Sequence, residues 1–281
     1  MRWFLFLAIG TQVVLLVPEL PGNGSTLVRG IWVVFATALL SWQGFTYLKR
    51  KRHMLYARLG LRVPRADRGY LRGLFDEYAE TYDQHLTGEL AYSAPQSLLE
   101  ILVPHIEGRL SAIADLGCGT GLCGPWFAPY ARSLVGVDLS ANMLAQARTR
   151  EVYDELVAAD LIDYLIDRPH RFDLCLAADV FVYAGDLQPA FAAVADALVP
   201  GGYFAFTVEI TTDRKWRLHT TGRYAHSAAY LRALAEATGF AIVASRPAAY
   251  RLQYGQPAPG AVWLLQSLEG RAGSGPTQSI K

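Results

Sequence analysis

The sequence predicts an α/β fold in which helices cover both faces of a mainly parallel sheet. Short apolar runs of strand length alternate with helix-length stretches along most of the chain, which is the pattern of repeated βαβ units. The run 113–116 leads directly into a glycine-rich loop, 117–121, as the first strand of a nucleotide-binding unit does. The 281 residues suffice for one large domain and an appendage.

Composition and charge narrow the classes of function. The formal net charge of +1 points to no polyanionic partner, and the sequence shows no nucleic-acid-binding motif, so we expect no nucleic acid as a partner. The cysteines Cys118, Cys123 and Cys175 have neither the pattern of a disulfide framework nor the spacing of a zinc site. We therefore expect a reducing compartment and no metal. A small side chain between two glycines explains Cys118 better than a nucleophile does.

The first 48 residues hold the excess of apolar residues, which make up 52% of the whole chain. Runs 3–17 and 27–48 are separated by a turn, and the second run is long enough to span hydrocarbon. The basic run 49–52 follows at once, and positive charge beside a spanning helix stays in the cytoplasm. We predict that residues 1–48 form a transmembrane helical hairpin in the cell membrane, with the rest of the chain on the cytoplasmic side. A cleaved signal peptide for the first run and a buried soluble hairpin are the alternatives.

Three further segments follow the hairpin. Residues 49–68 form a basic connector, which is either a helix lying on anionic headgroups or simply the flank that stops transfer across the membrane. Residues 69–268 form the soluble domain. The polar residues 269–281, rich in Gly and Ser, form a disordered tail.

The soluble domain opens with two predicted helices and then alternates between strands and helices. In the first helix, 74–86, the apolar and aromatic side chains recur on one face, and the second, 97–103, ends at a proline. We predict strands at 113–116, 134–137, 156–159, 172–179, 203–209, 241–245 and 262–267. We predict helices from about 122 and over 141–150, 163–166, 187–198 and 228–238, of which 187–198 ends at Pro200-Gly201-Gly202.

Three of the predicted strands end in an aspartate. Asp115 precedes the glycine loop, and its carboxylate suits a cationic ligand such as a sulfonium with an α-ammonium group. Asp138 can accept hydrogen bonds from both hydroxyls of a ribose. Asp160 is placed to meet an adenine amino group. The simpler explanation for Asp138 and Asp160 is that they cap helices.

The loop also matches the dinucleotide fingerprint Gly-x-Gly-x-x-Gly at Gly119, Gly121 and Gly124. This match alone is weak. A pyrophosphate needs the helix N-terminus free for a dianion, and Asp115 beside the loop would repel one. The sequence therefore disfavours a nicotinamide dehydrogenase.

At Asp115–Gly121, Asp138 and Asp160 the chain resembles class I S-adenosylmethionine-dependent methyltransferases, and the resemblance extends over roughly 69–268. The closer resemblance is to predicted methyltransferases that in some members carry tetratricopeptide repeats, which this chain lacks. The stretches that carry the closer resemblance are Phe75–Ala79 with Tyr82-Asp83, Ala177–Tyr183 and Gly222–Ser227.

The resemblance implies a Rossmann-like sheet of seven strands whose last strand is antiparallel, with S-adenosyl-L-methionine as the cofactor. It implies that Gly117 and Gly119 contact the methionine part, Asp138 the ribose, and Asp160 with Leu161 the adenine. The other expected cofactor contacts are Ala178 near the methionine end, Tyr78 and Tyr82 closing over the site, and Asp115, Cys118 and Leu139 beside the motif residues. The two tyrosines could equally be ordinary helix-packing residues.

A general base is needed only if the acceptor carries a proton at its own pKa. The first choice is Asp179, which follows the fourth strand, and His226 is the second catalytic candidate by resemblance, together with Arg223. Ser227 as a helix cap is an equally good explanation for the pair His226-Ser227. The remaining candidates are His85, Tyr183 and His219.

The sequence thus predicts a membrane-tethered methyltransferase that moves a methyl group to an O, N or C atom of a small-molecule or lipid-like acceptor. A non-catalytic S-adenosylmethionine-binding module that assembles a complex at the membrane is the alternative. The acceptor and the oligomeric state stay open.

Overall fold

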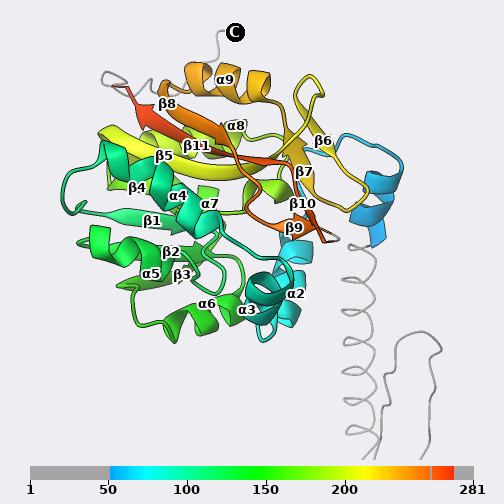
Figure 1. Ribbon diagram of the computed structural model, residues 1–281, viewed down its shortest axis with the longest axis horizontal. Helices are drawn as coiled ribbons and strands as arrows, with labels where there is room; N and C mark the ends of the chain where they lie inside the picture. The colour runs from blue at the N-terminus through cyan, green and yellow to red at the C-terminus, as the bar shows by residue number, and fades with distance from the viewer. Residues whose placement is uncertain (1–50, 254, 269–281) are drawn as a thin grey trace, which may run out of the picture. The chain divides into compact units, whose positions relative to one another are not determined.

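The order of the strands defines the architecture. The computed structural model describes residues 51–253 and 255–268, and Figure 1 shows a twisted sheet with helices on both sides. Seven strands follow one another in the order β3-β2-β1-β4-β5-β11-β8. Pairs among β3, β2, β1, β4 and β5 are parallel, whereas β11 is antiparallel to both β5 and β8. The predicted mainly parallel α/β sheet with an antiparallel last strand is confirmed.

All strands and helices expected after residue 97 are present, with ends displaced by a few residues. The strands of the main order are β1 Ile113–Leu116, β2 Leu134–Asp138, β3 Glu155–Ala158, β4 Phe172–Ala177, β5 Leu198–Ile210, β8 Phe240–Pro247 and β11 Gly260–Ser267. The helices of the domain are α2 Arg68–Tyr78, α3 Tyr82–Gln84, α4 Ala94–Leu102, α5 Gly124–Phe127, α6 Ala141–Arg148, α7 Leu161–Ile166, α8 Gln188–Ala197 and α9 Ala228–Ala237.

The two faces of the sheet bury separate cores, because successive residues of a strand point to opposite sides. In β4, Leu174 and Leu176 pack in the core that contains α4 and α5. Cys175 and Ala177 pack in the core that contains α7, α8 and α9. Burial on both faces explains why β4 is continuously apolar from Leu174 to Ala177 rather than alternating.

The strand order also places the site. β1 lies between β2 and β4: β2 and β3 are added on one side of β1, and β4 and β5 on the other. The loops that follow the carboxyl ends of β1 and β4 therefore border a crevice, which is where ligands bind in open sheets of this kind.

The N-terminal helix predicted over 74–86 is divided in the structure. α2 begins at Arg68, where the Asp67 carboxylate caps the helix by accepting from the Tyr70 amide at 3.0 Å. α2 ends at Tyr78, and a turn over 79–81 separates it from α3, which continues into a π-helix, His85–Glu89. The prediction of one continuous helix was therefore wrong. Contacts of this segment with the loops below it, described with the site, override the periodicity of its apolar residues.

The helix α8 ends at Ala197, before Pro200-Gly201-Gly202 as predicted, but β5 begins at Leu198 rather than at 203 and runs through these three residues. The pairing of β5 with β4 shifts register between Phe172 and Leu174, next to this segment. Gly201 has φ +78°, a conformation that a side chain would strain. The first residues of β5 therefore contain a bulge.

Four short strands were not expected from the sequence. β6 Trp216–Leu218 and β7 Tyr224–His226 form an antiparallel pair, and β7 extends the sheet by pairing with the carboxyl end of β5. β9 Leu252–Gln253 and β10 Gln256–Pro257 form a small hairpin between β8 and β11. Strands of two or three residues are too short to show periodicity.

Part of the basic connector packs on the domain. A helix over residues 51–58 places His53 and Ala57 against β6 and β7. The following residues 63–66, which we name the strap, run along Tyr183–Asp186: the amide of Ala66 donates to the Tyr183 carbonyl at 2.9 Å, and the amide of Gly185 donates to the Pro64 carbonyl at 2.8 Å. The connector therefore contributes structure to the domain as well as linking it.

The predicted hairpin 1–48 and the predicted tail 269–281 lie outside the described residues. Within 51–253 and 255–268, every helix is too short or too polar to cross a bilayer.

Candidate active site

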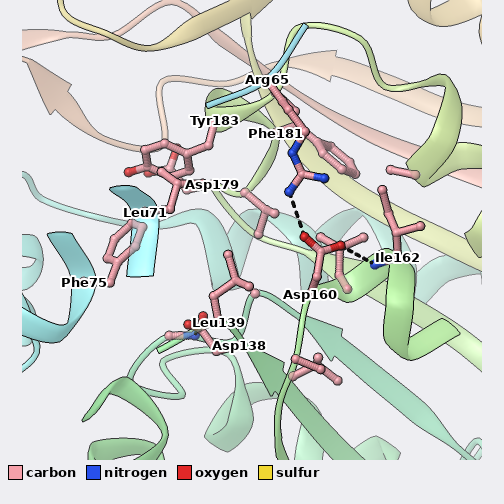
Figure 2. A pocket seen from close by; sticks show the side chains of 18 of the residues that line it. Arg65, Leu71, Phe75, Asp138, Leu139, Asp160, Ile162, Asp179, Phe181 and Tyr183 are labelled. Atoms are coloured by element: carbon pink, nitrogen blue, oxygen red, sulfur yellow. Dashed lines mark hydrogen bonds and ion pairs between the residues drawn. The ribbon is translucent and has the colours of Figure 1, made fainter. Parts of the chain in front are cut away.

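A cavity opens at the carboxyl ends of β1, β2 and β4, where the strand order predicts a ligand site (Figure 2). Its walls come from the glycine loop, the ends of these strands, α2, the strap and the segment after β4. Of the residues predicted from the sequence, the cavity is lined by Tyr82, Gly117, Gly119, Asp138, Leu139, Asp160, Leu161, Ala178 and Asp179. The structure thus brings together residues from segments that are far apart in the chain.

The glycine loop approaches the segment after β4 too closely for any side chain. A Cβ atom on Gly117 would lie 2.6 Å from a methyl group of Val180, and Gly117 has φ +69°. Both facts require glycine at this position. At this end the cavity is therefore lined by the backbone of the loop, without side chains.

Asp138 links the glycine loop to the end of β2. One carboxylate oxygen accepts from the Gly119 amide at 2.9 Å, and the other accepts from the Ser140 amide at 2.8 Å. Burial raises the pKa of Asp138, although these two amides oppose the rise. Each oxygen keeps a free lone pair, so the carboxylate can still accept from two vicinal hydroxyls of a ligand.

Asp160 follows β3, just before α7, and faces the same cavity from the side of Ile162 (Figure 2). One oxygen accepts from the Ile162 amide at 3.0 Å, which makes Asp160 the cap of α7. The other oxygen lies 2.7 Å from Arg65 and 2.8 Å from Arg68. The helix-cap explanation and the cavity-lining position therefore both hold for this residue.

Asp115 and Cys118 are buried beside the cavity but are not part of its wall. Asp115 accepts a hydrogen bond from the Tyr153 hydroxyl at 2.6 Å, and burial raises the pKa of its carboxyl to about 7. Burial also raises the pKa of the Cys118 thiol, which opposes the thiolate that a nucleophile needs. Asp115 therefore faces Tyr153 below the loop rather than the open cavity.

Tyr82 covers the glycine loop, with its ring 3.8 Å from where a Cβ on Gly119 would lie. Tyr78 is not part of the cavity wall. Its ring packs edge-on against Tyr82 with centroids 5.3 Å apart, and against His85. Tyr78 thus supports the tyrosine that lines the site.

Two aspartates hold the helical segment α2–α3 over the loops. Asp76 accepts from the Ser140 hydroxyl at 2.5 Å, and Asp83 accepts from the Thr120 hydroxyl at 2.5 Å. The Asp83 carboxylate also forms an ion pair with Arg150. These contacts fix the segment α2–α3 to the same loops that line the bottom of the cavity.

Across the cavity from Ile162, the side chains of Asp179 and Tyr183 mark a polar end (Figure 2). Asp179 has φ +58°, and its carboxylate pairs with Arg223 at 2.5 Å. Arg223 also donates to Glu209 at 2.6 Å and to the Tyr183 hydroxyl at 3.3 Å. Burial raises the pKa of Asp179, and the charge of Arg223 opposes the rise. Arg223 thus fixes both polar groups that line this end.

The acid–base pairs continue behind this end of the cavity. Glu209, at the end of β5, also pairs with Arg251, which is 6% exposed. Two carboxylates and two guanidinium groups alternate in this buried cluster, so their charges balance. A balanced cluster keeps Arg223 in place because each charge has a partner.

His226 lies in β7, outside the cavity wall. Its Nε2 is 2.9 Å from the carbonyl of Ala184, and burial lowers its pKa to about 4. Ser227 caps α9 by accepting from the Tyr230 amide at 3.1 Å. The alternative role for Ser227 as a cap is therefore present, and His226 does not reach the other site residues.

Sequence reasoning did not assign roles to Arg65, Asp76, Asp83 or Glu209. Asp76 and Asp83 belong to the stretches that carry the family resemblance, so a signal was available for them. Arg65 is one of many basic residues in the connector, where its position carries no signal of its own. Within the described part of the chain, no group of His, Cys, Asp and Glu is arranged to hold a metal ion.

Comparison with known proteins identifies the domain that contains the glycine loop. Residues 114–206 match the family model described as a methyltransferase domain. These residues are therefore similar to a methyltransferase domain. The match begins in β1 and ends in β5, so it includes Asp138, Asp160 and Asp179.

A sequence relative of this methyltransferase domain is the malonyl-acyl-carrier protein O-methyltransferase of Enterobacter lignolyticus. The two are 30% identical over 145 residues, which is 52% of this chain and 55% of the relative. The chain spans about half the length of the curated relatives it matches.

Solved structures share the fold of the methyltransferase domain. The 1,6-didemethyltoxoflavin-N1-methyltransferase of Burkholderia thailandensis, with bound S-adenosylhomocysteine, superimposes with a TM-score of 0.57 at 20% identity and covers 74% of this chain and 92% of its own. The (4+2) cyclase SpnF superimposes with a TM-score of 0.60 at 16% identity and covers 74% of this chain and 99% of its own. The second likeness shows that the fold does not fix the reaction.

Proposed function

We propose that the chain is an S-adenosylmethionine-dependent methyltransferase that acts on a small-molecule or lipid-like acceptor at the cytoplasmic face of the cell membrane. The observation that carries the proposal is that Asp138 and Asp160 line one cavity together with the bare backbone of Gly117 and Gly119. The matched methyltransferase domain supports the same chemistry. The finer likeness to methyltransferases that in some members carry tetratricopeptide repeats remains a prediction.

The residues of the cavity fit the parts of S-adenosylmethionine. The Asp138 carboxylate has free lone pairs for the two ribose hydroxyls, and the Asp160 oxygen that accepts from Ile162 keeps one for an adenine amino group. Leu139, Ile162 and Phe181 offer apolar walls between these acids and the rest of the cavity.

When bound, this cofactor supplies a methyl group on a positively charged sulfur. Asp179 and Tyr183 are placed to orient an acceptor at the polar end of the cavity. With the cofactor held by Asp138, Asp160 and the glycine loop, its methyl group would pass to an acceptor atom held beside Asp179 and Tyr183, and sulfur would keep the electron pair of the broken bond. If the acceptor is a hydroxyl, its proton passes to Asp179, whose raised pKa suits a base better than an ordinary carboxylate. Tyr82 excludes water above the glycine loop.

Membrane attachment rests on the sequence of residues 1–52. Two apolar runs form a hairpin, and the basic run after the second places both ends and the methyltransferase domain in the cytoplasm. A tether raises the concentration of the domain near acceptors that are themselves in the bilayer. This argument favours a lipid-like acceptor.

The test is to incubate the full-length protein with methyl-labelled S-adenosylmethionine, membranes and soluble lysate. Label in the lipid extract supports the proposal in full, and label in the small polar pool supports methyl transfer without a lipid-like acceptor. The Asp138→Ala variant is the control that should transfer none. Calorimetric binding of the cofactor with label in neither pool nor in protein would instead establish the non-catalytic assembly module.

A further inference from the structure

The helix over residues 51–58 and the turn that follows it expose leucines and basic residues to solvent. Leu55 and Leu59, one helical turn apart, are 51% and 62% exposed, and Leu61 is 45% exposed. They are three of the eight large apolar side chains that the described residues expose. Lys51, Arg52, Arg58 and Arg62 are exposed in the same segment.

The inner face of this helix is fixed to the domain. His53 lies with Nε2 2.9 Å from the Gly222 carbonyl and stacks on Tyr70 with ring centroids 5.3 Å apart. Ala57 is buried in a cluster with Leu218 and Tyr224. The helix ends at a glycine, Gly60, with φ +64°. The exposed leucines therefore sit on an anchored element and not on a free terminus.

We propose that the exposed surface formed by this helix and the turn after it, with Leu55, Leu59 and Leu61 beside Arg58 and Arg62, docks on an anionic lipid bilayer. Leucines flanked by basic side chains are the composition of helices that lie in the membrane interface. Residues 1–50 precede the described part of this helix in the chain, and their sequence is mostly apolar. The basic side chains complement anionic headgroups.

Docking in this orientation would bring the acceptor end of the cavity toward the lipid. Gly222, whose carbonyl contacts His53, precedes Arg223, which holds Asp179 and Tyr183. One peptide bond thus separates the anchor of the helix from the arginine that orders the polar end. The inference rests on the proposed function for this orientation, because it places a lipid-like acceptor on the side where Asp179 lies.

The experiment uses the full-length protein with vesicles of phosphatidylcholine alone or mixed with phosphatidylglycerol. Leu59→Cys is labelled with an environment-sensitive fluorophore, and Ile166→Cys, at a side chain 65% exposed on α7, is the matched control. The native cysteines are all buried, so the label goes to the new site. We expect blue-shifted emission and several-fold weaker quenching by an aqueous quencher at position 59, and no change at position 166, in vesicles with phosphatidylglycerol. Replacing both Arg58 and Arg62 with alanine should remove the dependence on phosphatidylglycerol.

The outcomes separate this inference from membrane tethering. A protein that floats with both kinds of vesicle while position 59 stays as open to quencher as position 166 overturns the docking surface and leaves the tether. A protein that floats only with phosphatidylglycerol and protects position 59 supports the docking surface and contradicts the tether. A protein that floats with neither kind overturns both.

Discussion

The guanidinium group of Arg65 lies 2.7 Å from the carboxylate of Asp160, and the two residues come from segments on opposite sides of the cofactor cavity. Arg65 belongs to the strap, whereas Asp160 follows β3. The pair joins the connector to the end of the cavity that we assign to the adenine. Figure 2 shows this contact as a dashed line from Arg65 to the Asp160 carboxylate, which also contacts the Ile162 amide.

Arg65→Ala should weaken binding of S-adenosylmethionine about fivefold, the equivalent of roughly 1 kcal/mol, since Arg65 orients Asp160 but is itself partly exposed to solvent. Arg68 and the Ile162 amide still contact the Asp160 carboxylate in the variant. Isothermal calorimetry measures the change, with Arg72→Ala, an exposed site on α2, as the control. Equal affinities for wild type and Arg65→Ala would contradict a role for the strap in the cofactor site.

Asp138→Ala should lower cofactor affinity at least tenfold, because it removes the acceptor for the ribose hydroxyls. It should also lower the free energy of unfolding by about 1–3 kcal/mol, because the amides of Gly119 and Ser140 lose their partner. Asp154→Ala is a matched control, since Asp154 accepts from the Leu134 amide at 2.7 Å but does not line the cavity. The control should lose stability and keep affinity; unchanged affinity in Asp138→Ala would remove the ribose assignment.

Asp115→Asn should stabilise the protein more at pH 8 than at pH 5. Burial raises the pKa of Asp115 in the folded protein to about 7. The ionised carboxylate therefore destabilises the fold increasingly as the pH rises from the unfolded-state pKa, and the effect is complete above about pH 7. Between pH 5 and pH 8 the advantage of the asparagine should grow by roughly 2 kcal/mol, at about 1.4 kcal/mol for each unit of pKa. Urea unfolding of the wild type and of Asp115→Asn between pH 5 and pH 8 measures this difference in the free energy of unfolding. A difference that does not change with pH would mean that Asp115 stays ionised.

Arg223→Met should destabilise the domain by about 3 kcal/mol, because Asp179 and Glu209 lose a buried partner. Adding Asp179→Asn should recover part of the loss, because one unpaired buried charge is then removed. The exposed pair of Arg246 with Glu100 supplies the comparison: Arg246→Met should change stability by less than about 1 kcal/mol. If Arg223→Met and Arg246→Met had equal effects in unfolding experiments, the buried cluster would not order the acceptor end.

The sequence predicted the sheet well because burial on both faces leaves a strong signal. Strands such as β4 contain a continuous run of apolar residues, and the helices between them are bounded by caps or glycines. Asp138 and Asp160 could be placed in one site because parallel strands end at the same edge of a sheet. The same reasoning placed Asp115 beside the glycine loop, but it could not show that Tyr153 occupies its carboxylate.

What the sequence could not predict depends on contacts between distant segments. The helix is divided at 79–81 because Asp76 and Asp83 bind different loops. The spacing of apolar residues in the sequence does not indicate this division. His226 was a candidate base by resemblance, yet its position in β7 turns its ring toward Ala184. Arg65 is distant from the motif in the chain and meets the cavity only because the strap runs along Tyr183–Asp186.

The course of the strap decides where a recombinant fragment should start. A gene trimmed to begin at codon 69 would lose Arg65, the Val63 carbonyl that accepts from the Tyr224 hydroxyl, and the helix that covers Leu218. A version beginning at codon 49 keeps all three, and we expect it to yield the higher melting temperature. Expression trials that discard the basic segment as mere linker would therefore remove part of the enzyme.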